Sequence, residues 1–111
     1  MKGVHLDAAT VQNDQEIRDT IFSMGADYVS VVRDNKNKVM HVSFSRRGGG
    51  CGRIYVNVCS FLAKRHQDME IVVLESPSVG KFCRKARVRQ PGETHFARTS
   101  VLATADRLGV A

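Results

Sequence analysis

The chain has 111 residues and a formal net charge of +6 at pH 7, with 42% hydrophobic and 25% charged residues. This length predicts one globular domain over residues 1–111, and no segment has the ~20 apolar residues of a membrane helix or the apolar run of a signal peptide. The three cysteines lack a Cys-x-x-Cys pair and the four histidines lack ligand spacing, which disfavours disulfides and a metal site and predicts a reduced, cytoplasmic protein.

A helix is predicted over residues 13–25. Asn13 is a suitable N-cap, and the acids that follow it suit the first turn of a helix. Gly25 is placed to end the helix. The apolar residues of this segment fall at helical spacing: Ile17, Ile21, Phe22 and Met24.

Two strands follow. Residues 28–33 and 39–44 are rich in β-branched and aromatic side chains, which favour strands. The Asp-Asn-Lys-Asn sequence at residues 34–37 is typical of a turn. These segments therefore predict an antiparallel hairpin.

A glycine-rich segment comes next. It follows an apparent strand at residues 38–45 and precedes residues 53–66, whose conformation decides its meaning. Glycine lets the main chain approach an anion, and the free N–H groups of a helix's first turn point at it. Strand, loop and helix together would form a phosphate-binding site. The loop consists of Arg47, Gly48, Gly49, Gly50, Cys51 and Gly52.

Residues 53–66 fit two patterns. Ile54, Val58, Phe61 and Leu62 form one apolar stripe of a helix, and a polar tail follows them. The alternation of Ile54, Val56 and Val58 instead fits a third strand, with residues 46–52 as a basic turn. We adopt the helix and keep the strand as the alternative.

The rest of the chain predicts three further elements. Residues 70–74 form a short apolar run typical of a buried strand, and Pro77 follows it. Residues 81–89 fit either a helix or a basic edge strand, because apolar and basic side chains alternate from Phe82 to Val88. Residues 97–108 are helix-like, with Gly109 placed as a left-handed cap.

The positive charge is concentrated in the middle of the chain. Residues 46–89 contain ten Lys and Arg against three acidic residues, whereas residues 1–45 contain five against six. The glycine loop lies inside the basic part. A field of this sign attracts polyanions, either a nucleotide cofactor or a nucleic acid.

Residues 38–88 resemble the GNAT N-acetyltransferase superfamily. Met40 and Val42 followed by Arg47-Gly48-x-Gly50-x-Gly52 are similar to its acetyl-CoA signature, a strand entering Arg/Gln-x-x-Gly-x-Gly/Ala and then a helix. The strand at 70–74 lies at the family's distance of roughly twenty residues from the last glycine. Phe82-Cys83-Arg84-Lys85 is similar to the family's Phe-Tyr-x-Lys, which lies on the next helix.

The resemblance implies an α+β fold with a small mixed, mainly antiparallel sheet flanked by helices. It also implies that the loop amides bind the pyrophosphate of acetyl-CoA, and that two parallel strands splay apart to admit the pantetheine arm. An amine acceptor, unknown here, would attack the thioester directly. The cofactor-binding residues carried over by position are Arg47, Gly48, Gly50, Gly52 and Arg53.

The catalytic positions depart from the family pattern. Cys83 stands where the family usually has a tyrosine, often the acid that protonates the leaving thiolate. A cysteine would serve only with a suitable pKa. No carboxylate is marked as a general base, so His41 on the preceding strand is the candidate base.

Two other classes of function remain open. If residues 53–59 are a strand, Tyr28, Phe44 and Tyr55 would lie on a sheet rimmed by arginines, the pattern of a small basic nucleic-acid-binding module. The size also fits a small protein-binding inhibitor without enzymatic activity. No sequence feature tests that third class.

Overall fold

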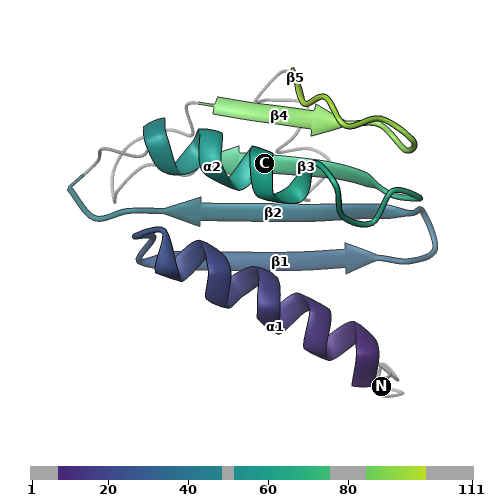
Figure 1. Ribbon diagram of the computed structural model, residues 1–111, viewed down its shortest axis with the longest axis horizontal. Helices are drawn as coiled ribbons and strands as arrows, with labels where there is room; N and C mark the ends of the chain where they lie inside the picture. The colour runs from purple at the N-terminus through teal and green to yellow at the C-terminus, as the bar shows by residue number, and fades with distance from the viewer. Residues whose placement is uncertain (1–7, 49–51, 76–84, 100–111) are drawn as a thin grey trace.

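The computed structural model describes residues 8–48, 52–75 and 85–99 as a compact α+β domain (Figure 1). The strands of this part form one open, mixed sheet in the order β1-β2-β3-β4-β5, in which only β2 and β3 are parallel. The predicted fold class is therefore confirmed at this level. The elements are α1 (Ala8–Ser23), β1 (Tyr28–Asp34), β2 (Val39–Ser45), α2 (Gly52–Leu62), β3 (Glu70–Glu75), β4 (Lys85–Arg89) and β5 (Ala97–Arg98).

The predicted hairpin is confirmed. β1 and β2 pair antiparallel over seven positions, from Tyr28 opposite Ser45 to Asp34 opposite Val39. The side chain of Asp34 accepts hydrogen bonds from the backbone N–H and the side-chain amide of Asn37, at 3.1 and 2.7 Å. These bonds lower the pKa of Asp34 and fix the turn.

The segment at residues 53–66, which fitted both a helix and a strand pattern, contains helix α2. The stripe residues Ile54, Val58 and Leu62 are at most 4% exposed, whereas Val56, which the strand alternation would bury with them, is 55% exposed. The segment is therefore a helix and not a strand, because the helical stripe packs all its apolar side chains against the sheet. α2 ends at Leu62, four residues earlier than the predicted segment, and the chain turns at His66, whose φ is +48°.

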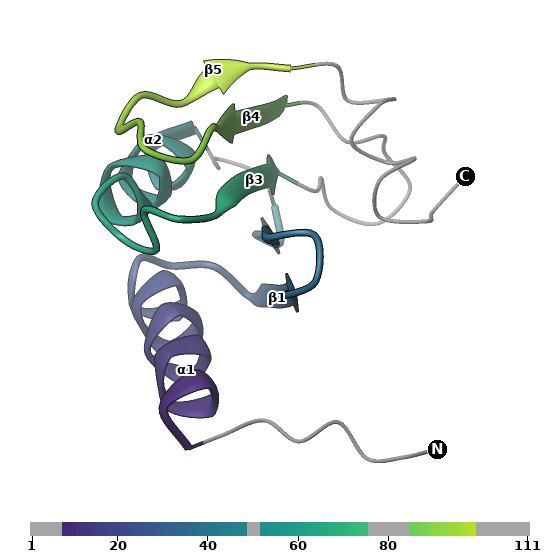
Figure 2. The ribbon, with the colours of Figure 1, turned by 90° about the vertical axis from the view of Figure 1, so that its right-hand side faces the viewer.

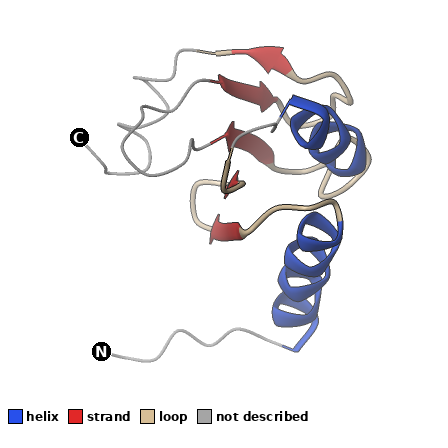
Figure 3. Cartoon of the chain, turned by 90° about the vertical axis from the view of Figure 1, so that its left-hand side faces the viewer, coloured by secondary structure: helices blue, strands red, loops and turns tan. Residues whose placement is uncertain are grey.

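Both helices cover the same face of the sheet, as Figures 2 and 3 show. β2 and β3 connect through α2, which is the crossover that a parallel pair requires. In the part of the chain described, neither helix is long and apolar enough to cross a membrane. The core between helices and sheet includes Ile17, Ile21, Val29, Met40, Val42, Phe44, Ile54, Val58, Leu62, Ile71 and Val73.

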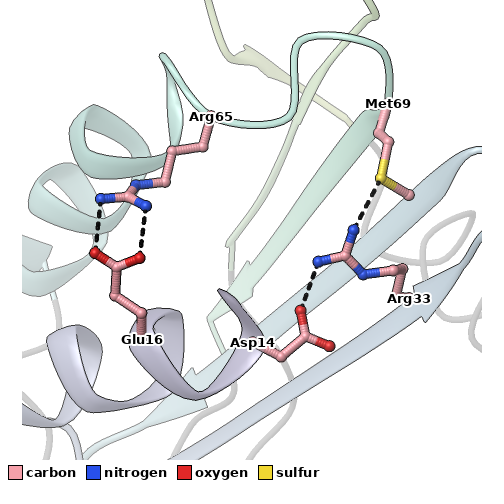
Figure 4. Close-up of polar contacts among 5 residues, drawn as sticks. All are labelled: Asp14, Glu16, Arg33, Arg65 and Met69. Carbon is pink, nitrogen blue, oxygen red and sulfur yellow. Dashed lines mark hydrogen bonds and ion pairs between the residues drawn. The ribbon is translucent and has the colours of Figure 1, made fainter. Parts of the chain in front are cut away.

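α1 begins before the predicted start. Its first residue is Ala8, so Asn13 lies inside the helix and is not its N-cap. Asp14 was expected in the first turn, but its carboxylate pairs with Arg33 of β1 at 2.7 Å (Figure 4). Tertiary pairing, and not helix capping, explains that acid.

The C-terminal elements differ in part from the predictions. Residues 85–89 form a strand, which confirms the strand alternative for this segment, so Lys85 is not on the helix that the GNAT resemblance implied. β4 is not an edge, however, because β5 pairs with it. Ala97 and Arg98 form β5, where a helix was predicted to start. Their register opposite β4 continues into the hydrogen bond from the Thr99 N–H to the Ala86 carbonyl, at 3.1 Å. The Thr99 N–H thus bonds within the sheet and not within a helix. Residues 82–84 and 100–108 lie outside the described residues.

Candidate phosphate-binding site

The candidate site lies where β2 leads into α2. The chain leaves the sheet after Ser45, passes Arg47 and Gly48, and enters α2 at Gly52. β3 runs parallel to β2, so both strands end at this edge of the sheet, beside the N-terminus of α2. Ligands of open α/β sheets bind at such carboxyl ends. The predicted succession of strand, glycine loop and helix is therefore present.

The first turn of α2 is open to solvent. Gly52 and Arg53 are exposed, and a Cβ added at Gly52 would meet no atom within 4 Å. The first turn contains no acidic residue that would satisfy its free N–H groups. Gly48 has a φ of +85°, a conformation that suits glycine. Among the described residues, no atom lies within 4 Å of a Cβ added at either glycine.

One loop amide is already engaged. The Arg47 N–H donates to the Asp27 carboxylate at 2.6 Å, which ties the start of the loop to the end of the α1–β1 connection. This amide is therefore not available to a phosphate, whereas the Arg47 side chain is exposed. The predicted ligand Gly50 and its neighbours Gly49 and Cys51 lie outside the described residues.

His41, one of the two catalytic candidates, is not brought to this site. Met40 and Val42 face the helices, so His41 between them faces the opposite side of the sheet from α2. The prediction that His41 serves as base at the loop therefore conflicts with the alternation of β2. Cys83 lies outside the described residues.

The expected splaying of the parallel strands is not present where they pair. β2 and β3 remain in register over six positions, from Val39 opposite Glu70 to Phe44 opposite Glu75. An uninterrupted ladder leaves no slot for a pantetheine arm between these residues. This departure bears on acetyl transfer more than on phosphate binding.

A buried polar cluster lies beside the loop, and sequence reasoning did not find it. Tyr55 and Cys59 occupy successive turns of α2, and the Arg87 guanidinium of β4 lies 5.4 Å from the Tyr55 ring centre. Glu75, at the end of β3, is 7% exposed, and its buried Oε1 has no hydrogen-bond partner among the described residues. Glu75 and Arg87 both face α2, because the alternation of β3 and β4 places them there.

A shallow pocket of about 200 Å³ adjoins the cluster on the side of β4 and β5. Cys59 and Arg87 link the cluster to the pocket. The sequence signal for this arrangement was weak: Tyr55 and Cys59 are four residues apart on the buried side of α2 and read as ordinary core residues. The lining residues are Val56, Cys59, Ser60, Ala63, Arg87, Thr94, His95 and Phe96.

The raised pKa of the buried Cys59 thiol leads us to expect a loss of stability at alkaline pH. Burial raises the pKa of Cys59 to about 11, against an opposing effect of Arg87, whereas a cysteine in the unfolded chain titrates near ~8.5. The unfolded chain thus loses this proton first, so the free energy of unfolding should fall as pH rises from ~8.5 to about 11. Urea unfolding between pH 8 and pH 10.5 measures this fall. A C59A variant should fall less steeply, and parallel curves would contradict the assignment.

The aromatic platform of the nucleic-acid alternative is not formed. Phe44 and Tyr55 are 0% and 1% exposed, and their ring centres lie 6.2 Å apart inside the core. Tyr28 alone of the three predicted rings is exposed. The predicted stacking surface is therefore wrong, because it required residues 53–59 to be a strand.

Comparison with known proteins adds no family: no family model, curated protein or solved structure matches the chain. Among the residues that the structure describes, no group of three or more His, Cys, Asp and Glu side chains is arranged to hold a metal ion.

Proposed function

We propose that the protein binds a phosphate-bearing cofactor of the acetyl-CoA class at the N-terminus of α2. The observation that carries the proposal is the passage from β2, paired in parallel with β3, through the glycine loop into an open helix start. Backbone N–H groups and the positive end of the helix dipole together favour a pyrophosphate at such a position. The exposed guanidinium of Arg53 adds charge beside it.

The sheet topology supports the same proposal. The one parallel pair among the described strands is the pair that α2 connects, which agrees with the arrangement expected from the GNAT resemblance. The basic part of the chain, residues 46–89, contains this crossover. Arg47 and Arg53 of this part are exposed beside the candidate site, whereas Arg65 and Arg89 lie at the opposite end of α2.

The proposal concerns binding first. Acetyl transfer to an amine also requires an acid or base near the thioester and room for the pantetheine arm. The position of His41 and the continuous β2–β3 ladder give that step no support from the described residues. Transfer is therefore a prediction to be tested after binding.

Coenzyme A should stabilise the protein and G52E should abolish the effect. At a ligand concentration ten times Kd, binding to the native state adds about 1.4 kcal/mol, or a rise in Tm of roughly 5–10 °C. In G52E the new carboxylate repels phosphate. At a helix N-terminus that carboxylate should not lower stability without ligand, because it complements the dipole. Differential scanning fluorimetry with and without coenzyme A measures both effects.

Two controls isolate the phosphates and the position. Pantetheine lacks the pyrophosphate and should leave Tm unchanged. N57E adds the same charge at an exposed position farther along α2 and should still respond to coenzyme A. Equal responses of G52E and wild type, or no response of the wild type at millimolar coenzyme A, would refute the proposal.

A further inference from the structure

The shallow pocket of about 200 Å³ lies between α2 and the β4–β5 hairpin (Figure 2). One wall is a ridge of α2, formed by residues three and four positions apart, which therefore lie on one side of the helix. The other wall is the segment that leads into β5. The volume is below the roughly 300–1,000 Å³ of sites for drug-sized ligands, so the pocket suits a small molecule. The ridge consists of Val56, Ser60 and Ala63, and the other wall of Thr94, His95 and Phe96.

Arg87 brings a positive charge into the lining of this pocket. It lies opposite Val73 of β3, which faces the helices, so its side chain also leaves the sheet towards α2. The guanidinium lies 5.4 Å from the Tyr55 ring centre. Such a contact neutralises no charge and leaves other N–H groups of the guanidinium for an acceptor. Among the described residues, no carboxylate forms an ion pair with Arg87, Glu75 included; the ion pairs are those of Arg33, Lys38 and Arg65.

A second arginine adds to the positive charge here. Arg98 of β5 lies directly opposite Arg87, so the two side chains leave the sheet on the same face. Like charges directly opposite each other destabilise a sheet. An anion bound near both guanidinium groups would offset this repulsion by charge-assisted attraction. Arg98 is exposed and lies outside the pocket lining, so it contributes through its charge alone.

The lining also offers apolar surface that the core does not use. Val56 is 55% exposed and is one of four large apolar side chains exposed in the described part of the chain. Phe96 and Ala63 extend this apolar surface, and the hydroxyl groups of Ser60 and Thr94 are close by. A few polar groups within an apolar lining are typical of sites for small organic molecules.

We propose that this pocket binds a small organic carboxylate through Arg87, with the apolar group of the ligand against Val56 and Phe96. A guanidinium presents a planar pair of donors that matches the two oxygens of a carboxylate. The apolar surface favours an organic anion over an inorganic one, because only an organic group would remove Val56 from water. The described lining includes no residue of the glycine loop or of the first turn of α2, so this site is independent of the proposed cofactor site.

An NMR titration of the ¹⁵N-labelled protein with benzoate tests the proposal. At millimolar benzoate we expect saturable shifts at the amides of Ser60, Arg87 and Thr94. Benzamide has nearly the same shape without the charge, and inorganic phosphate has the charge without an apolar group. Neither should reproduce these shifts. The absence of saturable shifts with benzoate, or equal shifts with benzamide or phosphate, would overturn the proposal.

Arginine variants test the charge. R87M should weaken benzoate binding at least tenfold, because it removes the charge-assisted hydrogen bonds to the carboxylate. R46M is the matched control: Arg46 is an exposed arginine outside the lining, and its replacement should leave the affinity for benzoate unchanged. Equal affinities of R87M and the wild type would overturn the role of Arg87.

A second pair of variants needs no change to a buried residue. V56E places a carboxylate at the pocket, where it should abolish benzoate binding by repulsion, and Val56 is exposed enough for the variant to fold. N57E adds the same charge at the next residue, which is exposed and outside the lining, and should retain binding. G52E should also bind benzoate as the wild type does, even though it loses the response to coenzyme A. Unchanged binding in V56E, or equal loss in N57E, would overturn the proposed site.

Discussion

Replacing Arg89 with methionine should lower the free energy of unfolding by about 3 kcal/mol or more, because it leaves several buried backbone carbonyls without a donor, each at a cost of about 1–3 kcal/mol. Arg89 is 0% exposed, although it lies on a strand whose sequence reads as basic surface. Its guanidinium turns inward and donates to backbone carbonyls at the end of α2 and in the following loop. The acceptors are the carbonyls of Leu62, Ala63, Arg65, His66 and Met69.

These carbonyls explain the size of the effect. The last carbonyls of a helix have no partner within it, and each buried carbonyl left unsatisfied costs about 1–3 kcal/mol. Arg89 Nη1 lies 2.7 Å from the Arg65 carbonyl and Nη2 lies 2.8 Å from the Met69 carbonyl. Its positive charge also faces the negative end of the helix dipole. Methionine fills similar space and supplies no donor.

Urea denaturation at pH 7 measures the loss. R98M is the control, because Arg98 is exposed on β5 and its replacement should leave stability nearly unchanged. R89K should fall between wild type and R89M, since lysine retains the charge but cannot reach all the acceptors from one rigid fork. A loss below ~1 kcal/mol for R89M would show that water replaces the arginine without cost.

Removing Asp14 should cost about 3 kcal/mol, because it leaves the Arg33 charge buried without its partner. The Asp14 Oδ1 lies 2.7 Å from Arg33 Nη2, and the two side chains are 13% and 10% exposed (Figure 4). Arg33 Nη1 also contacts the Met69 sulfur at 3.7 Å. The pair therefore joins α1 to β1 and to the start of β3.

A neighbouring ion pair provides the comparison. Glu16 and Arg65 pair at 3.0 Å, also from α1, but their side chains are 50% and 35% exposed. Water and salt weaken such a pair, so E16A should cost less than about 1 kcal/mol. Urea unfolding of D14A, R33M and the double variant completes the test. The double variant should cost less than the sum of the single variants. Equal losses for D14A and E16A would contradict the role of burial.

Local patterns predicted the elements whose partners are near in sequence. The hairpin follows from β-branched runs around one turn, and β3 follows from its apolar run. α2 was predicted over its strand alternative because the apolar stripe continued to Leu62. The exposure of Val56 shows that the helical period, and not the strand alternation, describes this segment.

Distant partners explain what the sequence did not reveal. Arg87 and Arg89 were predicted as surface charges of an edge strand. Both face α2, because their register places them opposite the core residues Val73 and Ile71 of β3. Asp14 was predicted to lie in the first turn of a helix, whereas its carboxylate pairs with Arg33. Such roles depend on contacts across 19 or more residues, which periodicity does not encode.

The candidate site was predicted in part. The start of the helix was predicted to within one residue, at Arg53 against Gly52 in the structure, because an apolar stripe after a strand and glycines is a local signal. The engagement of the Arg47 amide by Asp27 and the face on which His41 lies depend on how β1 and β2 sit in the sheet. The cluster of Tyr55, Glu75 and Arg87 depends on three elements at once.

The most direct test of phosphate binding is an NMR titration of the ¹⁵N-labelled protein with coenzyme A. The amides of Gly52 and Arg53 should show the largest saturable shifts, and adding pantetheine should not reproduce them. Arg47, whose N–H is held by Asp27, should shift less. Shifts that are absent, or that gather on β5 instead of the first turn of α2, would contradict a cofactor site at the glycine loop.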